Sequence, residues 1–255
     1  MTNRAIIVAI QASIVACFFG LWEIGAHAGW INPAWFSPPF EVLVRLGREI
    51  QGGHFLVHFW ATLVETLAGF VIGVIGGVAL GLTLGVMPRL RQILMPYLLM
   101  LYGIPRPALA PVFVLWFGIG LLSKIVLIVS LVYFVLLMYV LVGIRAINPA
   151  LIQFAFTTGA KSRQVVQKIM IPSVMPYVFA GMKLGIGLAI VGAVVGEIIA
   201  SREGLGYYIF QAAQRGDIQA VYAGLAALGI MSLVLVLGME WLDRRLFHWR
   251  QEVTL

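Results

Sequence analysis

Long apolar runs alternate with short polar segments along the whole chain. A run of about 20 apolar residues is long enough to cross the hydrocarbon layer of a bilayer as a helix. Six runs of this kind are predicted to span a membrane: Ala5–Gly25, Ala61–Val86, Ile93–Trp116, Lys124–Gly143, Tyr177–Ala200 and Val221–Leu242. The pattern therefore predicts an all-α fold, a polytopic membrane protein built as a bundle of about six transmembrane helices.

The distribution of lysine and arginine predicts how the chain is oriented. With the N-terminus placed in the cytosol, ten of these residues fall on cytosolic segments and five on outer segments. The inner set is Arg4, Arg89, Arg91, Arg145, Lys161, Arg163, Lys168, Arg244, Arg245 and Arg250, and the outer set is Arg45, Arg48, Lys124, Arg202 and Arg215. Because positive residues concentrate on the cytosolic side, both termini are predicted to be cytosolic.

Composition narrows the classes of function. The chain is 62% hydrophobic and 11% charged, whereas soluble domains carry about 25% charged residues. Its net charge of +7 follows from the orientation bias, so no nucleic-acid partner is inferred. Cys17 is the only cysteine, and His54 and His58 lack an obvious third ligand, so no metal site is predicted. No nucleophile–base pair stands out, and the chain is not predicted to be an enzyme.

The longest polar segment between apolar runs covers residues 148–176 and is predicted to form two short helices on the cytosolic side. The first helix is predicted to begin at the N-cap Asn148, which Pro149 follows, and to end at Gly159 in the left-handed conformation. The second helix is predicted over Arg163 to Ile169, with Ser162 as its cap and Pro172 and Pro176 as its stops. A rigid helix pair at this place is something that a soluble partner can push.

The spacing in this segment resembles the EAA loop of bacterial ABC importer permeases, which reads Glu-Ala-Ala, three residues, Gly, nine residues, Ile, one residue, Leu-Pro. The matching positions are Gln153, Phe154, Ala155, Gly159, Ile169, Ile171 and Pro172. Gln153, Phe154 and Ile171 depart from the pattern. Further segments carry the resemblance: SPPFEVL (37–43), LAPVFVLWFGIG (109–120), SKI (123–125), VGEIIAS (195–201) and GLGYYI (204–209). Together they resemble the nitrate, sulfonate, taurine and pyrimidine-precursor branch.

The resemblance implies a type I ABC importer permease of the bacterial cytoplasmic membrane. Such a permease would form the translocation path for a small anion, sulfonate or vitamin precursor. Its implied partners are the lipid bilayer, a second permease copy as a homodimer, ATPase subunits that bind ATP and Mg, and an extracytoplasmic binding protein. The implied coupling residues are Gln153, Ala155, Gly159, Ala160, Ile169 and Pro172. Residues 1–60 would hold an N-terminal helix and an extracytoplasmic amphipathic segment, 61–242 the permease core and 243–255 a cytosolic tail. The alternative is a stand-alone secondary transporter or channel.

Pro105, Arg106 and Pro107 interrupt the third apolar run. A break of this kind is typical of backbone that lines a cavity, and a charge inside a membrane span is a candidate for a functional site. These three residues, together with Glu197, are therefore predicted to line the translocation path. The alternatives are that Arg106 reaches the headgroups and that Glu197, like Glu65, serves a structural ion pair.

Glycine recurs at every fourth position of the second apolar run, at Gly69, Gly73, Gly77, Gly81 and Gly85. On a helix these residues form one smooth stripe that lets a neighbouring backbone approach closely. The stripe is predicted to be a helix-packing face, and it is also compatible with a face that slides during transport.

Overall fold

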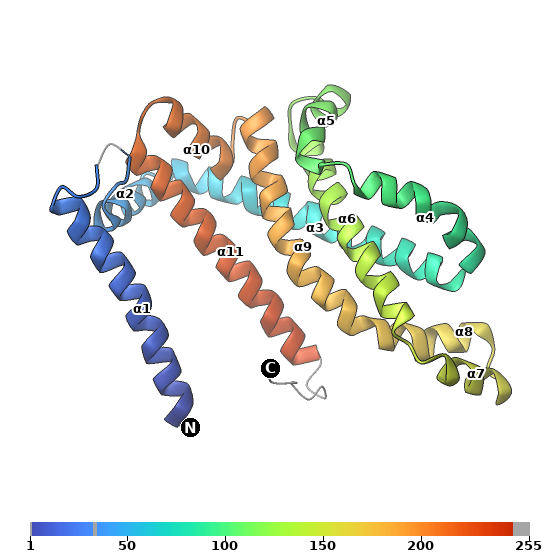
Figure 1. Cartoon of the computed structure of the whole chain (residues 1–255). Helices are drawn as coiled ribbons and strands as arrows, with labels where there is room; N and C mark the ends of the chain where they lie inside the picture. The colour runs from blue at the N-terminus through green and yellow to red at the C-terminus, as the bar shows by residue number, and fades with distance from the viewer. Residues whose placement is uncertain (1, 33–34, 247–255) are drawn as a thin grey trace.

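A computed structural model of the chain describes residues 2–32 and 35–246, and all regular structure in these ranges is helical (Figure 1). The all-α prediction is confirmed. The elements are α1 (Thr2–His27), α2 (Pro39–Gln51), α3 (His54–Val86), α4 (Pro88–Tyr102), a 3₁₀ turn (Arg106–Leu109), α5 (Ala110–Phe117), α6 (Leu121–Arg145), α7 (Pro149–Thr157), α8 (Ser162–Val165), a π turn (Val166–Met170), α9 (Ile171–Ala200), α10 (Leu205–Gln214) and α11 (Ile218–Leu246). Of the predicted tail at 243–255, residues 247–255, including Arg250, lie outside the described residues.

Five helical segments of the described chain are long and apolar enough to cross a membrane, and a sixth crossing requires a bent pair. The five are Ile6–His27, His54–Val86, Leu121–Arg145, Ser162–Ala200 and Ile218–Arg245. The bent pair joins Pro88–Tyr102 to Arg106–Phe117 at an angle of 82°. The prediction of one continuous span over Ile93–Trp116 is therefore wrong, because this region is two helices that meet at a sharp bend. Proline lacks a backbone N–H and clashes with the preceding helical turn, so Pro105 and Pro107 prevent a continuous helix.

Two predicted starts lie too far along the chain. Helix α3 begins at His54 rather than Ala61, so the proposed boundary after residue 60 falls inside a helix. Helix α6 begins at Leu121, which places Lys124 one turn inside a span rather than at its outer end. In each case a polar residue was taken to mark the end of a membrane span. The structure instead buries such residues inside the helices, namely His58 in α3 and Lys124 in α6.

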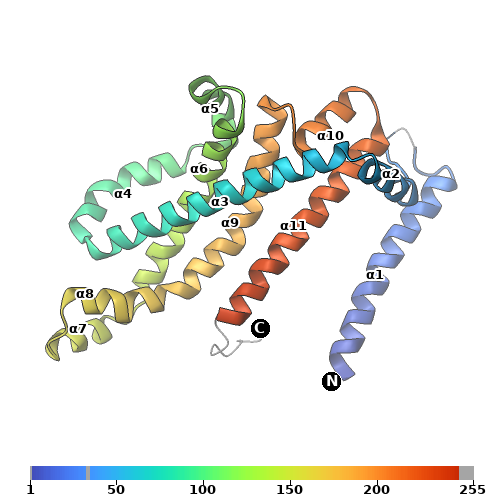
Figure 2. The same ribbon diagram turned by 180° about the vertical axis from the view of Figure 1, so that it is seen from behind.

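The centre of the bundle is α6, which packs between α3 and α9 (Figure 2). Four apolar side chains of α6 at helical spacing, Ile128, Val132, Leu136 and Val140, have no exposed surface. By contrast, α1 lies at the edge of the molecule and reaches the rest of the chain mainly through α2 and α11 (Figure 1). A helix that is apolar all round and unpacked in its own protomer is suited to a lipid or membrane-protein environment.

The helices place three features on one side of the bundle: the start of α1, the end of α11 and the α7–α8 pair (Figure 1). Helices α2, α5 and α10 lie on the opposite side. There, Arg45 of α2 forms an ion pair of 2.9 Å with Asp217, just before α11, and the amide of Gln219 donates to Glu41 at 2.7 Å. Although partial burial opposes the charged form, the carboxylates of Asp217 and Glu49 hold the pKa of Arg45 above its ordinary value.

Candidate functional site

The α7–α8 elbow, defined here as residues 148–170, begins as its sequence predicts. The Asn148 side-chain oxygen accepts a hydrogen bond of 2.9 Å from the backbone N–H of Ala150, and Pro149 occupies the first helical position. Both features stabilise a helix start, because they satisfy or remove N–H groups that have no partner within the helix. The predicted N-cap is confirmed.

Gly159 ends α7 in the left-handed conformation, with φ of +86°. Its N–H donates to the Phe156 carbonyl at 3.0 Å, and the N–H of Ala160 donates to the Ala155 carbonyl at 2.9 Å. This pair of bonds is the Schellman motif, which satisfies the last carbonyls of a helix and fixes the direction of the chain. The turn between α7 and α8 is therefore a defined corner rather than a flexible loop.

The second half of the elbow differs from its prediction. Ser162 is the first residue of α8 rather than its cap, and the N–H of Lys161 donates to the Gln164 side chain at 2.8 Å. Pro172 and Pro176 do not stop the helix, which continues through a π turn into α9. The wider π turn at Val166–Met170 changes the hydrogen-bond register ahead of Pro172, so a residue without an N–H is accommodated in the first turn of α9.

The residues that the resemblance assigns to coupling gather on this elbow and its exit into α9. Ala155 is buried under the corner, Ala160 and Ile169 are half-buried, and Gln153 and Pro172 are exposed. Three apolar side chains of α7, Leu151, Phe154 and Phe156, are also exposed although this end of the bundle carries polar and charged residues. An exposed apolar group rimmed by polar residues is typical of a protein contact. Coupling itself remains a prediction for these residues.

The glycine stripe of α3 faces α6 at very short range. A Cβ atom placed on Gly69, Gly73 or Gly81 would lie 2.5 to 2.7 Å from side chains of α6, and on Gly77 it would lie 2.5 Å from the Tyr133 carbonyl oxygen. At Gly85 the nearest atom belongs to the flexible end of Ile144. Close backbone approach of this kind fits the helix-packing reading of the stripe.

Arg106 lies beneath the break of the bent pair and is 8% exposed. Its guanidinium donates to the carbonyls of Leu101 at 2.6 Å, Ile104 at 3.2 Å and Ser130 at 3.4 Å, and it lies 4.1 Å above the Phe134 ring. Carbonyls released by a broken helix need donors inside a membrane, and Arg106 supplies them. These contacts explain the residue as a support of the break. Its assignment to the path, with Pro105 and Pro107, stays a prediction.

We expect Arg106→Gln to lower the free energy of unfolding by about 1–3 kcal/mol, because buried carbonyls lose their donors and the ring loses its cation. Arg106→Lys should recover only part of this loss, since an ammonium lacks the planar set of donors. Thermal stability of the purified protein measures the effect. A variant that retains full stability and still transports poorly would instead support the path assignment.

Glu197 is fully buried near the C-terminal end of α9 and holds the start of α10. Its carboxylate accepts hydrogen bonds from the Thr62 hydroxyl at 2.6 Å and the N–H of Gly206 at 2.7 Å. The N–H of Leu205 donates to Thr62 at 2.8 Å, and the N–H of Gly204 donates to His58 at 3.1 Å. Three consecutive N–H groups at a helix start are thus bound by side chains of α3 and α9, a helix cap made by distant residues.

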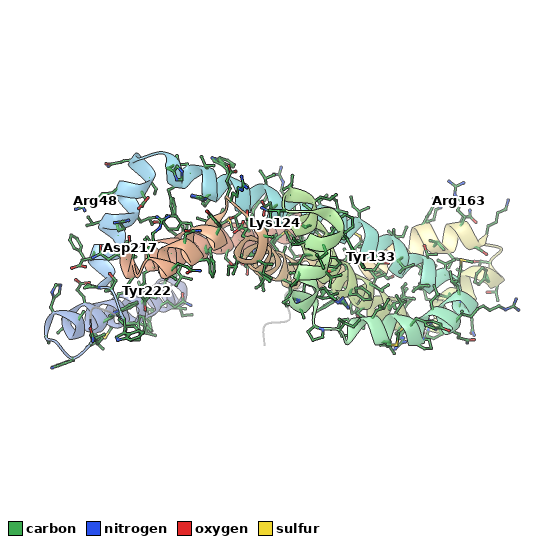
Figure 3. The ribbon with its side chains drawn as sticks, turned by 90° about the horizontal axis from the view of Figure 1, so that it is seen from above. Arg48, Lys124, Tyr133, Arg163, Asp217 and Tyr222 are labelled. Atoms are coloured by element: carbon green, nitrogen blue, oxygen red, sulfur yellow. The ribbon has the colours of Figure 1, made fainter. Side chains whose placement is uncertain are left out.

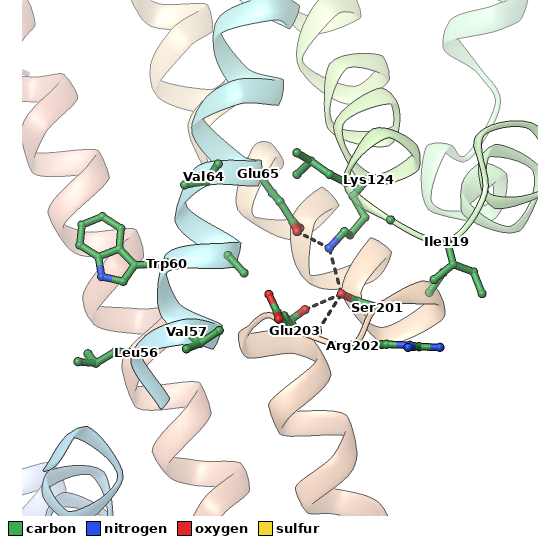
Figure 4. A pocket seen from close by; sticks show the side chains of 14 residues that line it. Leu56, Val57, Trp60, Val64, Glu65, Ile119, Lys124, Ser201, Arg202 and Glu203 are labelled. Atoms are coloured by element: carbon green, nitrogen blue, oxygen red, sulfur yellow. Dashed lines mark hydrogen bonds and ion pairs between the residues drawn. The ribbon is translucent and has the colours of Figure 1, made fainter. Parts of the chain in front are cut away.

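Beside this cap lies a buried ion pair between Glu65 of α3 and Lys124 of α6, with side chains 4% and 6% exposed (Figure 4). The Lys124 ammonium also donates to the Ser201 hydroxyl at 3.0 Å. The pair borders a cavity of about 890 Å³ that opens between Trp60 and the 200–203 segment. The structural ion pair weighed for Glu65 is therefore present, and with Ser201 it joins α3, α6 and the segment after α9 at the end of the bundle opposite the elbow.

The residues that make these contacts, His58, Thr62, Glu65, Lys124 and Glu197, are called the outer cluster here, because their end of the bundle is predicted to lie on the outer side. Sequence reasoning missed Lys124, Thr62 and His58 as its members. Lys124 was counted as an outer loop residue, and Thr62 and His58 gave no distinct signal because their partners are backbone N–H groups about 145 residues away. The one available signal was Ser123-Lys124 at the start of an apolar run, since a lysine that enters a span needs a buried partner.

Comparisons with known proteins agree with this architecture. The family described as "Binding-protein-dependent transport system inner membrane component" matches residues 69–248. The taurine transport system permease protein TauC of Escherichia coli K12 is 30% identical over 251 residues, which cover 96% of this chain and 91% of that protein. The riboflavin transport system permease protein RibX of Chloroflexus aurantiacus is 36% identical over 229 residues, covering 89% and 85%. A solved structure of the MetNI methionine ABC transporter, inward facing, superimposes with a TM-score of 0.69 at 19% identity, covering 77% of this chain and 98% of the other.

Proposed function

Because the chain belongs to the family of binding-protein-dependent transport system inner membrane components, we propose that the α7–α8 elbow is where an ATPase subunit drives it. Membership makes the chain a permease subunit of an ABC importer, with several spans in the inner membrane. The observation that carries the proposal is the defined corner at Gly159, which is joined through α8 and the π turn to a membrane-spanning helix. Packed elements with a fixed corner move as units.

The fold and family predictions are confirmed, including the branch that transports taurine and related solutes. The alternative of a stand-alone secondary transporter or channel is not supported, because the family match covers most of the chain and its relatives are permeases of transport systems.

The working assembly contains two copies of this chain, two cytosolic ATPase subunits that bind ATP and Mg, and an extracytoplasmic binding protein. ATP binding closes the ATPase dimer and moves the two elbows together, so that α9 tilts and the path opens outward to receive solute. Hydrolysis reverses the motion. The chain itself carries out no covalent chemistry in this scheme. The elbow, the start of α1 and the end of α11 face the cytosol in this scheme, and the basic residues of the elbow side support that orientation.

The solute is a small anion, sulfonate or vitamin precursor delivered by the binding protein. Support comes from the relatives, one of which is named for taurine and another for riboflavin. Selectivity would lie chiefly in the separate binding protein, and a ligand-binding assay on that partner identifies the solute.

Gly159 provides the test of coupling. We expect Gly159→Val to insert normally but to lose solute-stimulated ATP hydrolysis, because a β-branched residue strongly disfavours a φ of +86°. No atom lies within 4 Å of the position that a Cβ would occupy, so the effect would be conformational rather than a clash. Gly159→Asn is the matched control, since asparagine tolerates the left-handed region. Full coupling in the valine variant would contradict the proposal.

A further inference from the structure

The elbow side of the molecule carries cations without any carboxylate nearby in the sequence. Between Glu65 and Glu197 the chain has no aspartate or glutamate at all. Four cationic side chains, Arg145, Lys161, Arg163 and Lys168, are exposed on or next to the elbow, and none has an ion pair among the described residues. Membrane orientation accounts for the cations, but acidic residues contribute little to orientation. The absence of carboxylates therefore calls for another reason.

The elbow also contains a cavity of about 290 Å³ between the end of α7 and α8, with Gln164 and Lys168 in its wall. The Gln164 oxygen is already engaged by the N–H of Lys161 at 2.8 Å, which leaves its NH₂ group as a donor. The Thr158 hydroxyl lies 2.9 Å from the carbonyl of Ala155, to which it donates. Lys168 offers an ammonium and no acceptor. The Thr158 oxygen is thus left as an acceptor, whereas the Gln164 NH₂ group and the Lys168 ammonium are free donors. With a full positive charge on Lys168 and no carboxylate among the lining residues, the complementary occupant is an anionic acceptor.

The surroundings of the cavity favour a protein over a free anion. The apolar side chains of Leu151, Phe154 and Phe156 on α7 are 47%, 66% and 48% exposed. Arg163 lies at one extreme of the elongated molecule, far from Lys124 (Figure 3). An apolar patch therefore lies beside a cavity that carries a cation, at a projecting end of the molecule. Such a surface is complementary to a protein surface on which an acidic side chain is surrounded by apolar ones.

We propose that this cavity is a socket for an aspartate or glutamate side chain of the ATPase subunit, bound chiefly by the Lys168 ammonium. The inference rests on the proposed function, since it names the chemistry of the partner at the same elbow. Gln153 fits the scheme, because it leaves α7 without a carboxylate that would repel the partner. Charge complementarity of this kind fixes which surface docks and speeds its association.

The small number of lysines allows a direct test by zero-length carbodiimide cross-linking, which joins an amine to a carboxylate in contact with it. The chain has four lysines: Lys124 is buried in its ion pair, Lys183 pairs with Asp243 at 2.5 Å, and Lys161 and Lys168 are exposed. In the purified complex of permease and ATPase, we expect a cross-linked product between the two chains. Lys168→Arg keeps the charge but removes the amine, so most of the product should be lost. Lys161→Arg, the matched control, should retain it.

Charge reversal separates the socket from general attraction to anionic lipid headgroups. We expect Lys168→Glu to reduce co-purification of the ATPase subunit strongly. Arg89→Glu, the same type of change at another exposed basic residue that is predicted to be cytosolic, should leave it near the wild-type level. Equal losses in both variants would overturn the socket, and so would an unchanged cross-link in Lys168→Arg. If no ATPase subunit co-purifies with the wild-type chain, the proposed function itself fails.

Discussion

Replacing Lys124 with methionine is expected to cost about 3–5 kcal/mol of stability, because a buried carboxylate loses its cation. Glu65 is buried and has Lys124 as its ion-pair partner, while Glu197 lies in the same outer cluster. The methionine variant would leave the buried Glu65 carboxylate without its ammonium. Thermal unfolding of the purified protein, together with the yield of inserted protein, measures the loss.

The double variant Lys124→Met/Glu65→Gln should recover most of that stability, since removing both partners leaves no unpaired charge at this pair. Lys183→Met is the matched control. Its ion pair with Asp243 has side chains 38% and 27% exposed, so breaking it should cost less than breaking the buried Glu65–Lys124 pair. Equal losses from Lys124→Met and Lys183→Met would show that the outer ion pair does not hold the bundle together.

Gly77→Leu is expected to abolish assembly of the bundle, and Gly77→Ala to destabilise it by about 1–3 kcal/mol through overpacking. A Cβ at this position would lie 2.5 Å from the Tyr133 carbonyl oxygen and 2.7 Å from the Leu136 Cβ. Backbone atoms of α6 cannot move aside as the end of a side chain can, so α3 and α6 would have to separate. Detergent-resistant folding and protease protection provide the measurement.

Gly229→Ala on α11 isolates the clash from the change of residue type. No atom lies within 4 Å of its Cβ position, and alanine is favoured over glycine in a helix by about 1 kcal/mol. The control should therefore be neutral or slightly stabilised. If Gly77→Ala behaves in the same way, the stripe does not set the distance between α3 and α6.

The sequence predicted the elements whose signals are local. The length of the apolar runs predicted most of the membrane-spanning helices. Asn148, Pro149 and Gly159 predicted the boundaries of α7, because helix caps and left-handed residues act within one helical turn. Features that depend on a distant partner were missed. Pro172 was read as a stop, since nothing in the local pattern reveals the π turn ahead of it.

The outer cluster shows the same limit for the site. Lys124 looks like a loop residue until Glu65, 59 positions earlier, is placed beside it, and Thr62 becomes a helix cap only when Leu205 is folded onto it. The bend of 82° at Pro105 was predicted as a break but not as a change of direction. Arg106 donates to carbonyls of α4 and α6, at Leu101 and Ser130, and these contacts across the bend leave no signal in the local pattern.

The uninterrupted course of α8, the π turn and α9 has a mechanical consequence. The run from Ser162 to Ala200 has 39 residues, and at 1.5 Å per residue its contour is about 58 Å. The hydrocarbon layer is about 30 Å thick, so roughly half of the run is an arm that extends outside it. The whole run begins at the elbow and ends three residues beyond Glu197, which holds the start of α10. No loop interrupts this run, so a force applied at the elbow would be carried by helix alone to the start of α10 at the other end of the bundle.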